Sequence, residues 1–344
     1  MTSSDRWAPA AGPALVLGYC VINSAKSVLE GALVQDLSPE FLALNAFLLA
    51  QLFYFVVCRD KRALVVAVRR NWADLLAFNV STTVSWVAVL YAFTVFEPVV
   101  ANSVIIGLIP SLTILIGKGL RPGTRALPLE LFAAGCVLCA MGFLLTTSWS
   151  GSSAVGGVST AELVFGVTAC VLTAVAVVGN TFFTKRLSEG GMTVPQMMAS
   201  RFVLLIVTTF VVMTVRDSAA PYTAGTLTAI AAIGCVGVII SLYLLQQGIV
   251  RTEPITVSML FGTNLAITYV VQFFDPRLHQ SATSLIGTAA LCLSICLGAW
   301  ARMRNRPEPG ATATASAATT ATTATTATNA TSASTVTTAS RAST

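Results

Sequence analysis

The chain has 344 residues, of which 55% are hydrophobic and only 10% are charged. Soluble domains carry about 25% charged residues, so this composition excludes a water-soluble globular protein. The net charge of +6 is compatible with nucleic-acid binding, but the positions of the charges account for it otherwise. We therefore expect an all-α protein embedded in the lipid bilayer, with no nucleic-acid partner.

A membrane-spanning helix needs about 20 mostly apolar residues, and ten segments of the chain have this length and character. The predicted spans cover residues 14–34, 40–58, 72–93, 97–117, 127–147, 162–183, 194–214, 224–248, 254–274 and 281–301. A polar leader, 1–13, precedes them. The Ala/Thr/Ser-rich tract 302–344 follows them, and because it cannot bury a core we expect a disordered cytoplasmic tail.

The twenty Lys and Arg residues predict the orientation of the spans. With the N-terminus in the cytoplasm, all but four of them fall in cytoplasmic segments. Arg216 and Arg277 fall in outer loops, and Lys26 and Arg201 fall inside spans. This positive-inside asymmetry places both termini in the cytoplasm and explains the net charge without nucleic acid.

An internal repeat divides the predicted spans into two halves. The segment Glu97–Ser103 resembles Glu253–Ser258, and the same ungapped offset pairs Cys136 with Cys292. A repeat of this kind indicates duplication, with repeats at 14–147 and 162–301 joined by an external Gly/Ser-rich linker, 148–161. Because each half has five spans, the second half enters the membrane from the opposite side. The sequence thus predicts an inverted 5+5 repeat.

The first predicted span carries the polar residues that are most costly in lipid. Asn23, Lys26 and Glu30 follow i, i+3, i+7 spacing and share one helix face. A charge near the bilayer centre costs at least about 2.5–3.5 kcal/mol, so we expect this face to line a water-filled cavity that binds substrate. The alternative is that Lys26 and Glu30 only neutralise each other at i, i+4.

Further candidate substrate-binding or translocation residues lie in other spans. The third span has a polar face with one aromatic residue, formed by Asn79, Thr82, Thr83 and Trp86. These could line the cavity or make hydrogen bonds between helices. Arg201 could bind an anionic group, or extend its charge to the cytoplasmic interface. The second half adds Asn180, Asn264, Thr268 and Tyr269, and Pro110 interrupts the fourth span as a predicted hinge.

Motifs for catalysis are missing from the sequence. No Walker A sequence, no His-Glu-x-x-His and no Gly-x-Ser-x-Gly occurs. Cys136 and Cys139 have CxxC spacing, but they lie within an apolar run and read as small packing residues. We therefore expect no enzyme activity, no catalytic residues, no bound metal and no cofactor.

The stretch Tyr91–Ser103, continuing through Leu108-Ile109-Pro110-Ser111, resembles the drug/metabolite transporter superfamily, and its EamA-type branch most of all. The shared pattern is a short turn, small residues and a proline within the helix. The resemblance implies ten spans, an inverted repeat, a cavity between the halves and alternating access by a monomer or homodimer.

The sequence therefore predicts a secondary transporter of the plasma membrane that exports a small polar or amphipathic metabolite. Without a nucleotide site, a gradient of the substrate or of a coupled ion must drive it, and a proton exchanged at Lys26 is one candidate. Inverted repeats commonly bind substrate near the midplane. One alternative is a nucleotide-sugar or phosphorylated-metabolite antiporter. Another is a membrane scaffold or sensor that signals through its tail without transport.

Overall fold

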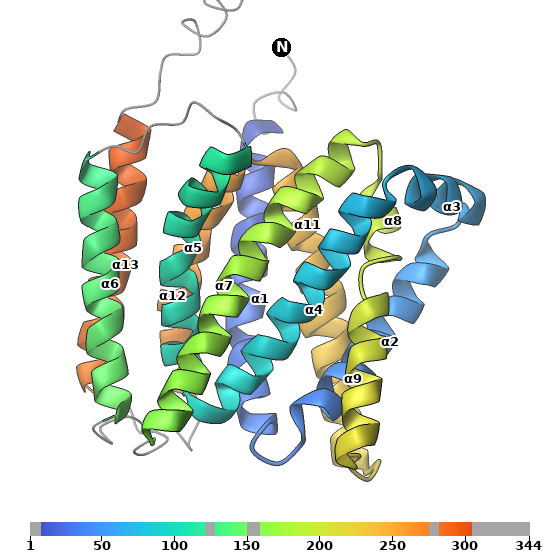
Figure 1. Ribbon diagram of the computed structural model, residues 1–344, viewed down its shortest axis with the longest axis horizontal. Helices are drawn as coiled ribbons and strands as arrows, with labels where there is room; N and C mark the ends of the chain where they lie inside the picture. The colour runs from blue at the N-terminus through green and yellow to red at the C-terminus, as the bar shows by residue number, and fades with distance from the viewer. Residues whose placement is uncertain (1–7, 121–127, 150–158, 275–281, 305–344) are drawn as a thin grey trace, which may run out of the picture. The chain divides into compact units, whose positions relative to one another are not determined.

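The computed structural model describes residues 8–120, 128–149, 159–274 and 282–304, and every regular element in these ranges is a helix (Figure 1). The first half contains α1 (Ala8–Leu33), α2 (Pro39–Val57), α3 (Lys61–Arg70), α4 (Trp72–Val95), α5 (Pro98–Leu120) and α6 (Pro128–Trp149). The second half contains α7 (Thr160–Glu189), α8 (Val194–Met198), α9 (Val203–Arg216), α10 (Ala224–Ala232), η2 (Ile233–Ile240), α11 (Ser241–Arg251), α12 (Pro254–Gln272) and α13 (Ala282–Arg304). The all-helical prediction is confirmed for this part of the chain.

Six of the described helical segments are long and apolar enough to cross a membrane. They are Ala11–Leu33, Pro39–Val57, Trp72–Val95, Thr160–Glu189, Val194–Arg216 and Ala224–Arg251. Shorter apolar helical stretches occupy Pro98–Thr113, Gly135–Thr146 and Leu285–Ile295. These segments are compatible with a multi-pass protein embedded in a membrane, while the count of ten spans stays a prediction.

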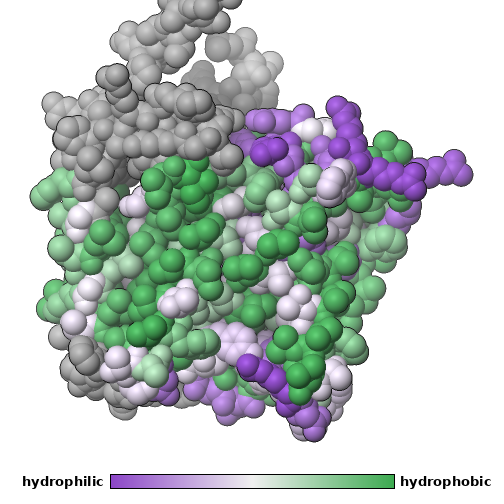
Figure 2. Space-filling view, in the orientation of Figure 1, coloured by the Kyte–Doolittle hydropathy of each residue, from purple (hydrophilic) through white to green (hydrophobic). Residues whose placement is uncertain are grey.

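Large apolar side chains lie on the outside of these helices. Figure 2 shows them as a broad hydrophobic area between hydrophilic residues at its upper right and lower edges. Val56, Val215 and Leu293 are 75%, 81% and 71% exposed. Soluble monomers rarely expose contiguous apolar areas of this extent, so the outer surface is suited to lipid.

Local sequence determines several helix starts. Ser38 precedes Pro39 and its side chain accepts a hydrogen bond from the backbone N–H of Phe41, which caps α2. Ser159 and Glu162 form a reciprocal capping box at the start of α7. Both devices satisfy backbone donors that the first helical turn leaves unpaired.

Three elements differ from the expected single helices and loops. The short helix α3 occupies a stretch expected as a cytoplasmic loop, and its mixed basic and apolar sequence is typical of a helix at a membrane surface. The expected span 194–214 is broken into α8 and α9. The expected span 224–248 contains the π-helix η2, a rare form that is frequently found at functional sites.

The chain divides into two units, Met1–Ala299 and Trp300–Thr344. Most of the predicted tail, 302–344, most of the linker, 148–161, and part of the leader, 1–13, lie outside the described residues. Within the described residues the first helix begins at Ala8 and continues through Pro13, so it includes the end of the predicted leader.

Within the first unit, helices from the two halves of the chain pack against each other. α4 runs along α7, and α1 packs against α11 and α12 (Figure 1). α5 contacts both α7 and α12, while α2 contacts α9 and η2. Gly287 of α13 lies so close to α6 that a Cβ atom there would be 2.5 Å from the Leu144 side chain. This packing surrounds the polar faces of α1 and α4 with protein.

Candidate functional site

A cavity lies among α1, α4, α5, α7, α11 and α12, and it offers about 100 Å³ to the centres of water-sized molecules. Since one water needs at least about 10–15 Å³ by this measure, the space suits several waters or a small solute. Its charged lining residues, among the described part of the chain, are Lys26, Glu30 and Arg201. Most of the remaining wall is apolar. The cavity therefore brings three buried charges together with hydrophobic surface.

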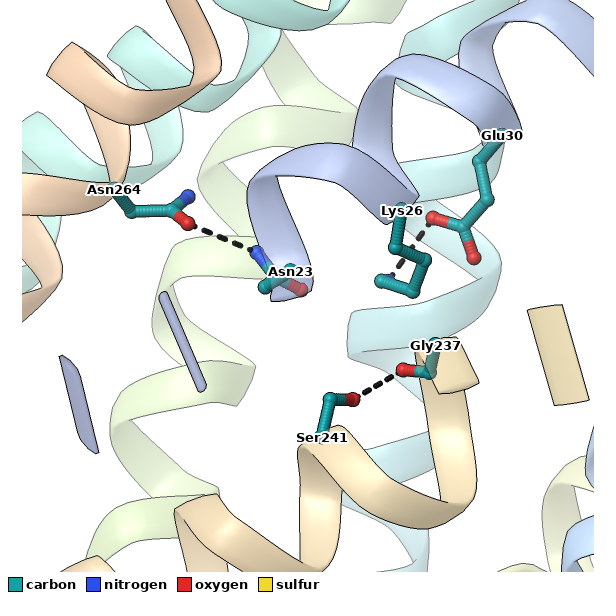
Figure 3. A network of polar contacts seen from close by, with 6 residues as sticks. All are labelled: Asn23, Lys26, Glu30, Gly237, Ser241 and Asn264. Carbon is teal, nitrogen blue, oxygen red and sulfur yellow. Dashed lines mark hydrogen bonds and ion pairs between the residues drawn. The ribbon is translucent and has the colours of Figure 1, made fainter. Parts of the chain in front are cut away.

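Lys26 and Glu30 form an ion pair on α1 (Figure 3). The Nζ atom of Lys26 lies 3.0 Å from Oε2 of Glu30, and their side chains are 5% and 3% exposed. The same Nζ atom lies 4.0 Å from the ring centroid of Trp86, which allows a cation–π interaction. Lys26 and Glu30 both line the cavity, so the ion pair lies next to any solute that the cavity holds. Trp86 of α4 also contacts the ammonium group of Lys26.

The methylene chain of Lys26 packs against η2. A Cβ atom added to Gly237 would lie 2.6 Å from Cγ of Lys26, so glycine is needed for this approach. Ser241 donates a hydrogen bond to the carbonyl of Gly237, as Figure 3 shows. Tyr54 donates another to the carbonyl of Ile239. These hydroxyls satisfy carbonyls in and near the π-helix, where the regular α-helical pairing is interrupted.

Arg201 lies in the break between α8 and α9, and it is 2% exposed. Its Nε donates to Oγ1 of Thr82 at 3.1 Å, and its Cζ lies 4.6 Å from the ring centroid of Phe78. Nη1 is buried and has no hydrogen-bond partner among the described residues. Likewise, no described carboxylate lies within 4.0 Å of the guanidinium. Within the described part of the chain, Arg201 is thus a buried cation without a counter-ion.

The break that positions Arg201 is held by side chains of α2 and α4. The amide of Gln51 donates to the carbonyl of Ala199 and accepts from the N–H of Phe202. Asn79 donates to the carbonyl of Ser200 at 2.9 Å and accepts from the N–H of Leu204. Irregular backbone within a membrane is tolerated only where protein or water satisfies its polar groups, and these two amides do so.

A chain of polar side chains joins Arg201 to α7. Oγ1 of Thr82, which accepts from Arg201, lies 3.1 Å from Oδ1 of Asn180 and donates to it. The amide of Asn180 donates to Oγ of Ser85 at 3.3 Å. Through these contacts the α4 face reaches α7 as well as the break before α9.

A second polar group joins α1 to α12. Nδ2 of Asn23 donates to Oδ1 of Asn264 at 3.4 Å (Figure 3), and Oγ of Ser24 donates to the same oxygen at 2.8 Å. Thr268 donates to Oγ of Ser24 at 3.1 Å. These contacts connect helices more than 200 positions apart in the sequence.

The residues predicted from sequence fall into two groups. Those that line the cavity are Asn23, Lys26, Glu30, Trp86, Asn180, Arg201 and Asn264. Thr82 contacts the cavity through Arg201, from which its hydroxyl accepts a hydrogen bond. The others bond to backbone or neighbouring helices: Asn79 at the break, Thr83 to the carbonyl of Asn79, Thr268 to Ser24 and Asn264, and Tyr269 in a ring contact with Phe273. Pro110 lies inside the continuous helix α5, and its role as a hinge stays a prediction.

Sequence reasoning missed two amides in the cavity wall. Asn102 of α5 and Gln246 of α11 line the cavity, and each has a buried side-chain nitrogen without a partner in the described structure. Gln246 accepts a hydrogen bond from Thr184 at 2.9 Å. An amide inside an apolar span was the available signal in both cases, because such groups are costly away from water.

A further cavity lies toward the ends of α2, α4, α7 and α9. The hydroxyl of Tyr91 donates to Oε2 of Glu40 at 3.2 Å and accepts from Nη1 of Arg216 at 2.7 Å. Ser218 donates to the other oxygen of Glu40 at 2.7 Å. This cluster ties the α1–α2 corner to α4 and α9.

Comparison with known proteins gives the fold alone. No family model matches the chain, and no curated protein matches it. Among solved structures, 24 chains match. One, described as "Crystal structure of protein", has a TM-score of 0.60 at 15% identity, covering 89% of this chain and 100% of that chain. The chain therefore shares its fold with a protein of known structure across most of its length.

Proposed function

We propose that this protein is a secondary transporter that exports a small polar or amphipathic metabolite by alternating access. The observation that carries the proposal is a cavity lined by three charged side chains inside a bundle of apolar helices. Charged groups within membrane segments are costly and mark substrate or ion pathways. The apolar part of the wall would accommodate the hydrophobic part of an amphipathic solute.

The packing of the helices supports an inverted 5+5 repeat within this proposal. α4 packs along α7, and the α10–α11 segment, at the corresponding position of the second half, packs with α1. Likewise α5 contacts α7, while its counterpart α12 contacts α1. Each of these contacts between the halves therefore has a counterpart in which the corresponding helices of the two halves change places. A measured structure in which α1–α6 and α7–α13 fail to superpose about an in-plane twofold axis would reject the repeat.

The proposed cavity is built from both halves of a single chain. α1, α4 and α5 come from the first half, and α7, α11 and α12 from the second. Relative movement of the halves would thus change access to it, and no second copy is required. We propose that the protein acts in the plasma membrane with both termini in the cytoplasm, in agreement with its distribution of basic residues.

The transport proposal is tested by counterflow in proteoliposomes. Vesicles preloaded with an unlabelled amino acid, short carboxylate or sugar phosphate should accumulate the labelled form of one of these solutes, whereas empty vesicles should not. Lys26→Ala should reduce uptake, because it leaves Glu30 without its partner 3.0 Å away. Folded protein that gives no counterflow with any of the three classes would contradict the proposal. A signalling activity that is lost on deletion of the tail, residues 302–344, would favour the scaffold or sensor alternative.

A further inference from the structure

The three charges in the cavity wall do not balance. Lys26 and Glu30 neutralise each other at 3.0 Å, and this leaves Arg201 as the additional positive charge. Arg201 is 2% exposed, and its guanidinium donates to the hydroxyl of Thr82 and lies over the rings of Phe78 and Phe202. A buried charge is normally paired, so the residues that line the cavity carry a net charge that a bound anion would neutralise.

The unpartnered polar atoms of the cavity wall point to the same ligand chemistry. In the described structure they are Nη1 of Arg201, Nδ2 of Asn102 and Nε2 of Gln246. All three are hydrogen-bond donors, and none of the buried unpartnered oxygens belongs to a residue that lines this cavity. A solute that satisfies these groups must supply acceptors. Carboxylate and phosphate oxygens do this, and they match the fork geometry of arginine.

The apolar part of the wall limits what the rest of the solute can be. Ile105, Ile109, Leu245 and Phe261 line it with apolar surface. The volume available is small, about 100 Å³ for the centres of water-sized molecules. A compact molecule with one oxyanion group and an apolar portion fits both the charge and the surface.

We propose that the central cavity binds a small oxyanion, with Arg201 as the residue that pairs its carboxylate or phosphate group. Lys26 remains paired with Glu30, and this pair forms part of the wall of the binding cavity. The identification of this solute as cargo rests on the proposed transport function. The binding of the anion does not, and it is measured without transport.

The first test needs no ligand. In buffer free of oxyanions, Arg201→Gln should unfold at the same temperature as the parent protein or higher, because it removes a buried charge that has no described counter-ion. A structural role for Arg201 predicts the opposite. Earlier unfolding of Arg201→Gln than of the parent would therefore overturn the proposal. Arg201→Lys, which keeps the charge without the fork, should resemble the parent.

The second test uses matched probes on purified protein in detergent at constant ionic strength. Propionate, benzoate and inorganic phosphate are compared with the neutral amides propionamide and benzamide by calorimetry and thermal unfolding. At least one anion should bind and raise the unfolding temperature, while its amide should not. Arg201→Gln should weaken that binding on the order of 100-fold, since a buried charged partner is lost. Arg186→Gln, at a pair whose arginine side chain is 52% exposed, should leave it unchanged.

The outcomes show whether the bound group is a carboxylate or a phosphate. They also distinguish failure of the anion-binding inference from failure of the transport proposal. Response to the carboxylates alone or to phosphate alone assigns the group that Arg201 binds. Equal response to acid and amide, no response to any anion, or full response in Arg201→Gln would overturn the inference. Anion binding by a protein that carries out no counterflow would refute transport alone. Transport that persists unchanged in Arg201→Gln would refute the role of Arg201 and leave transport standing.

Discussion

Removal of the charge of Glu30 should destabilise the protein, because Lys26 would remain buried without a counter-ion. The pair is 3.0 Å apart with side chains 5% and 3% exposed, so bulk solvent can compensate only weakly for the loss of the carboxylate. Breaking a buried pair by removal of one partner costs about 3–5 kcal/mol. Glu30→Gln keeps a hydrogen-bond acceptor, so we expect about 3 kcal/mol, the lower end of this range. For a chain of 344 residues, with an unfolding entropy of about 2 cal/mol/K per residue, that is a decrease of about 4 °C in unfolding temperature.

A double-mutant cycle separates the charge from other effects of the substitution. The combination of Lys26→Met with Glu30→Gln removes both charges and should restore stability to within about 1 kcal/mol of the parent or above it. Asp74→Asn is the matched control, because its partner Arg186 is 52% exposed at a similar distance of 2.9 Å. It should cost less than about 1 kcal/mol. Thermal unfolding in detergent compares the parent, the two single variants, the double variant and the control. A double variant as unstable as the sum of the single variants would refute the reasoning.

Three further predictions concern the surroundings of the cavity. Gly237→Ala should displace Lys26, lower stability by about 1–3 kcal/mol and reduce counterflow, because its Cβ would lie 2.6 Å from Cγ of Lys26. Gly142→Ala, with no atom within 4 Å of its Cβ, is the control and should not destabilise. Asn79→Ala should cost about 1–3 kcal/mol and reduce anion binding, since it leaves backbone groups at the break unpaired. Tyr91→Phe should increase hydrogen exchange at residues 35–40, because it removes the hydroxyl that donates to Oε2 of Glu40 and leaves the carboxylate only its hydrogen bond from Ser218.

Each of these three predictions has a clear contrary result. Equal unfolding temperatures for Gly237→Ala and Gly142→Ala would mean that Lys26 does not depend on the close approach of η2. An Asn79→Ala protein with parental stability would show that water can satisfy the break before α9. Unchanged exchange in Tyr91→Phe would mean that other contacts hold the α1–α2 corner.

The sequence alone determined the helices and one face of the cavity. Long apolar segments must satisfy their backbone groups internally, so hydropathy predicted the helical regions of the chain. The spacing of Asn23, Lys26 and Glu30 predicted a shared face on α1, because helical periodicity is a local property. The structure places all three in the cavity wall.

The tertiary structure decided which polar groups are paired and which are free. Nothing in the sequence around Arg201 marks a helix break, since its stabilising partners Gln51 and Asn79 are distant in the chain. Asn79 and Trp86 belong to one predicted polar face of α4, but their environments differ. Asn79 bonds to the break before α9, whereas Trp86 lines the cavity. Local patterns specify faces of a helix, but neighbouring helices determine the environment of each side chain. For that reason the charge without a counter-ion could be found only after Lys26, Glu30 and Arg201 had been placed in one cavity.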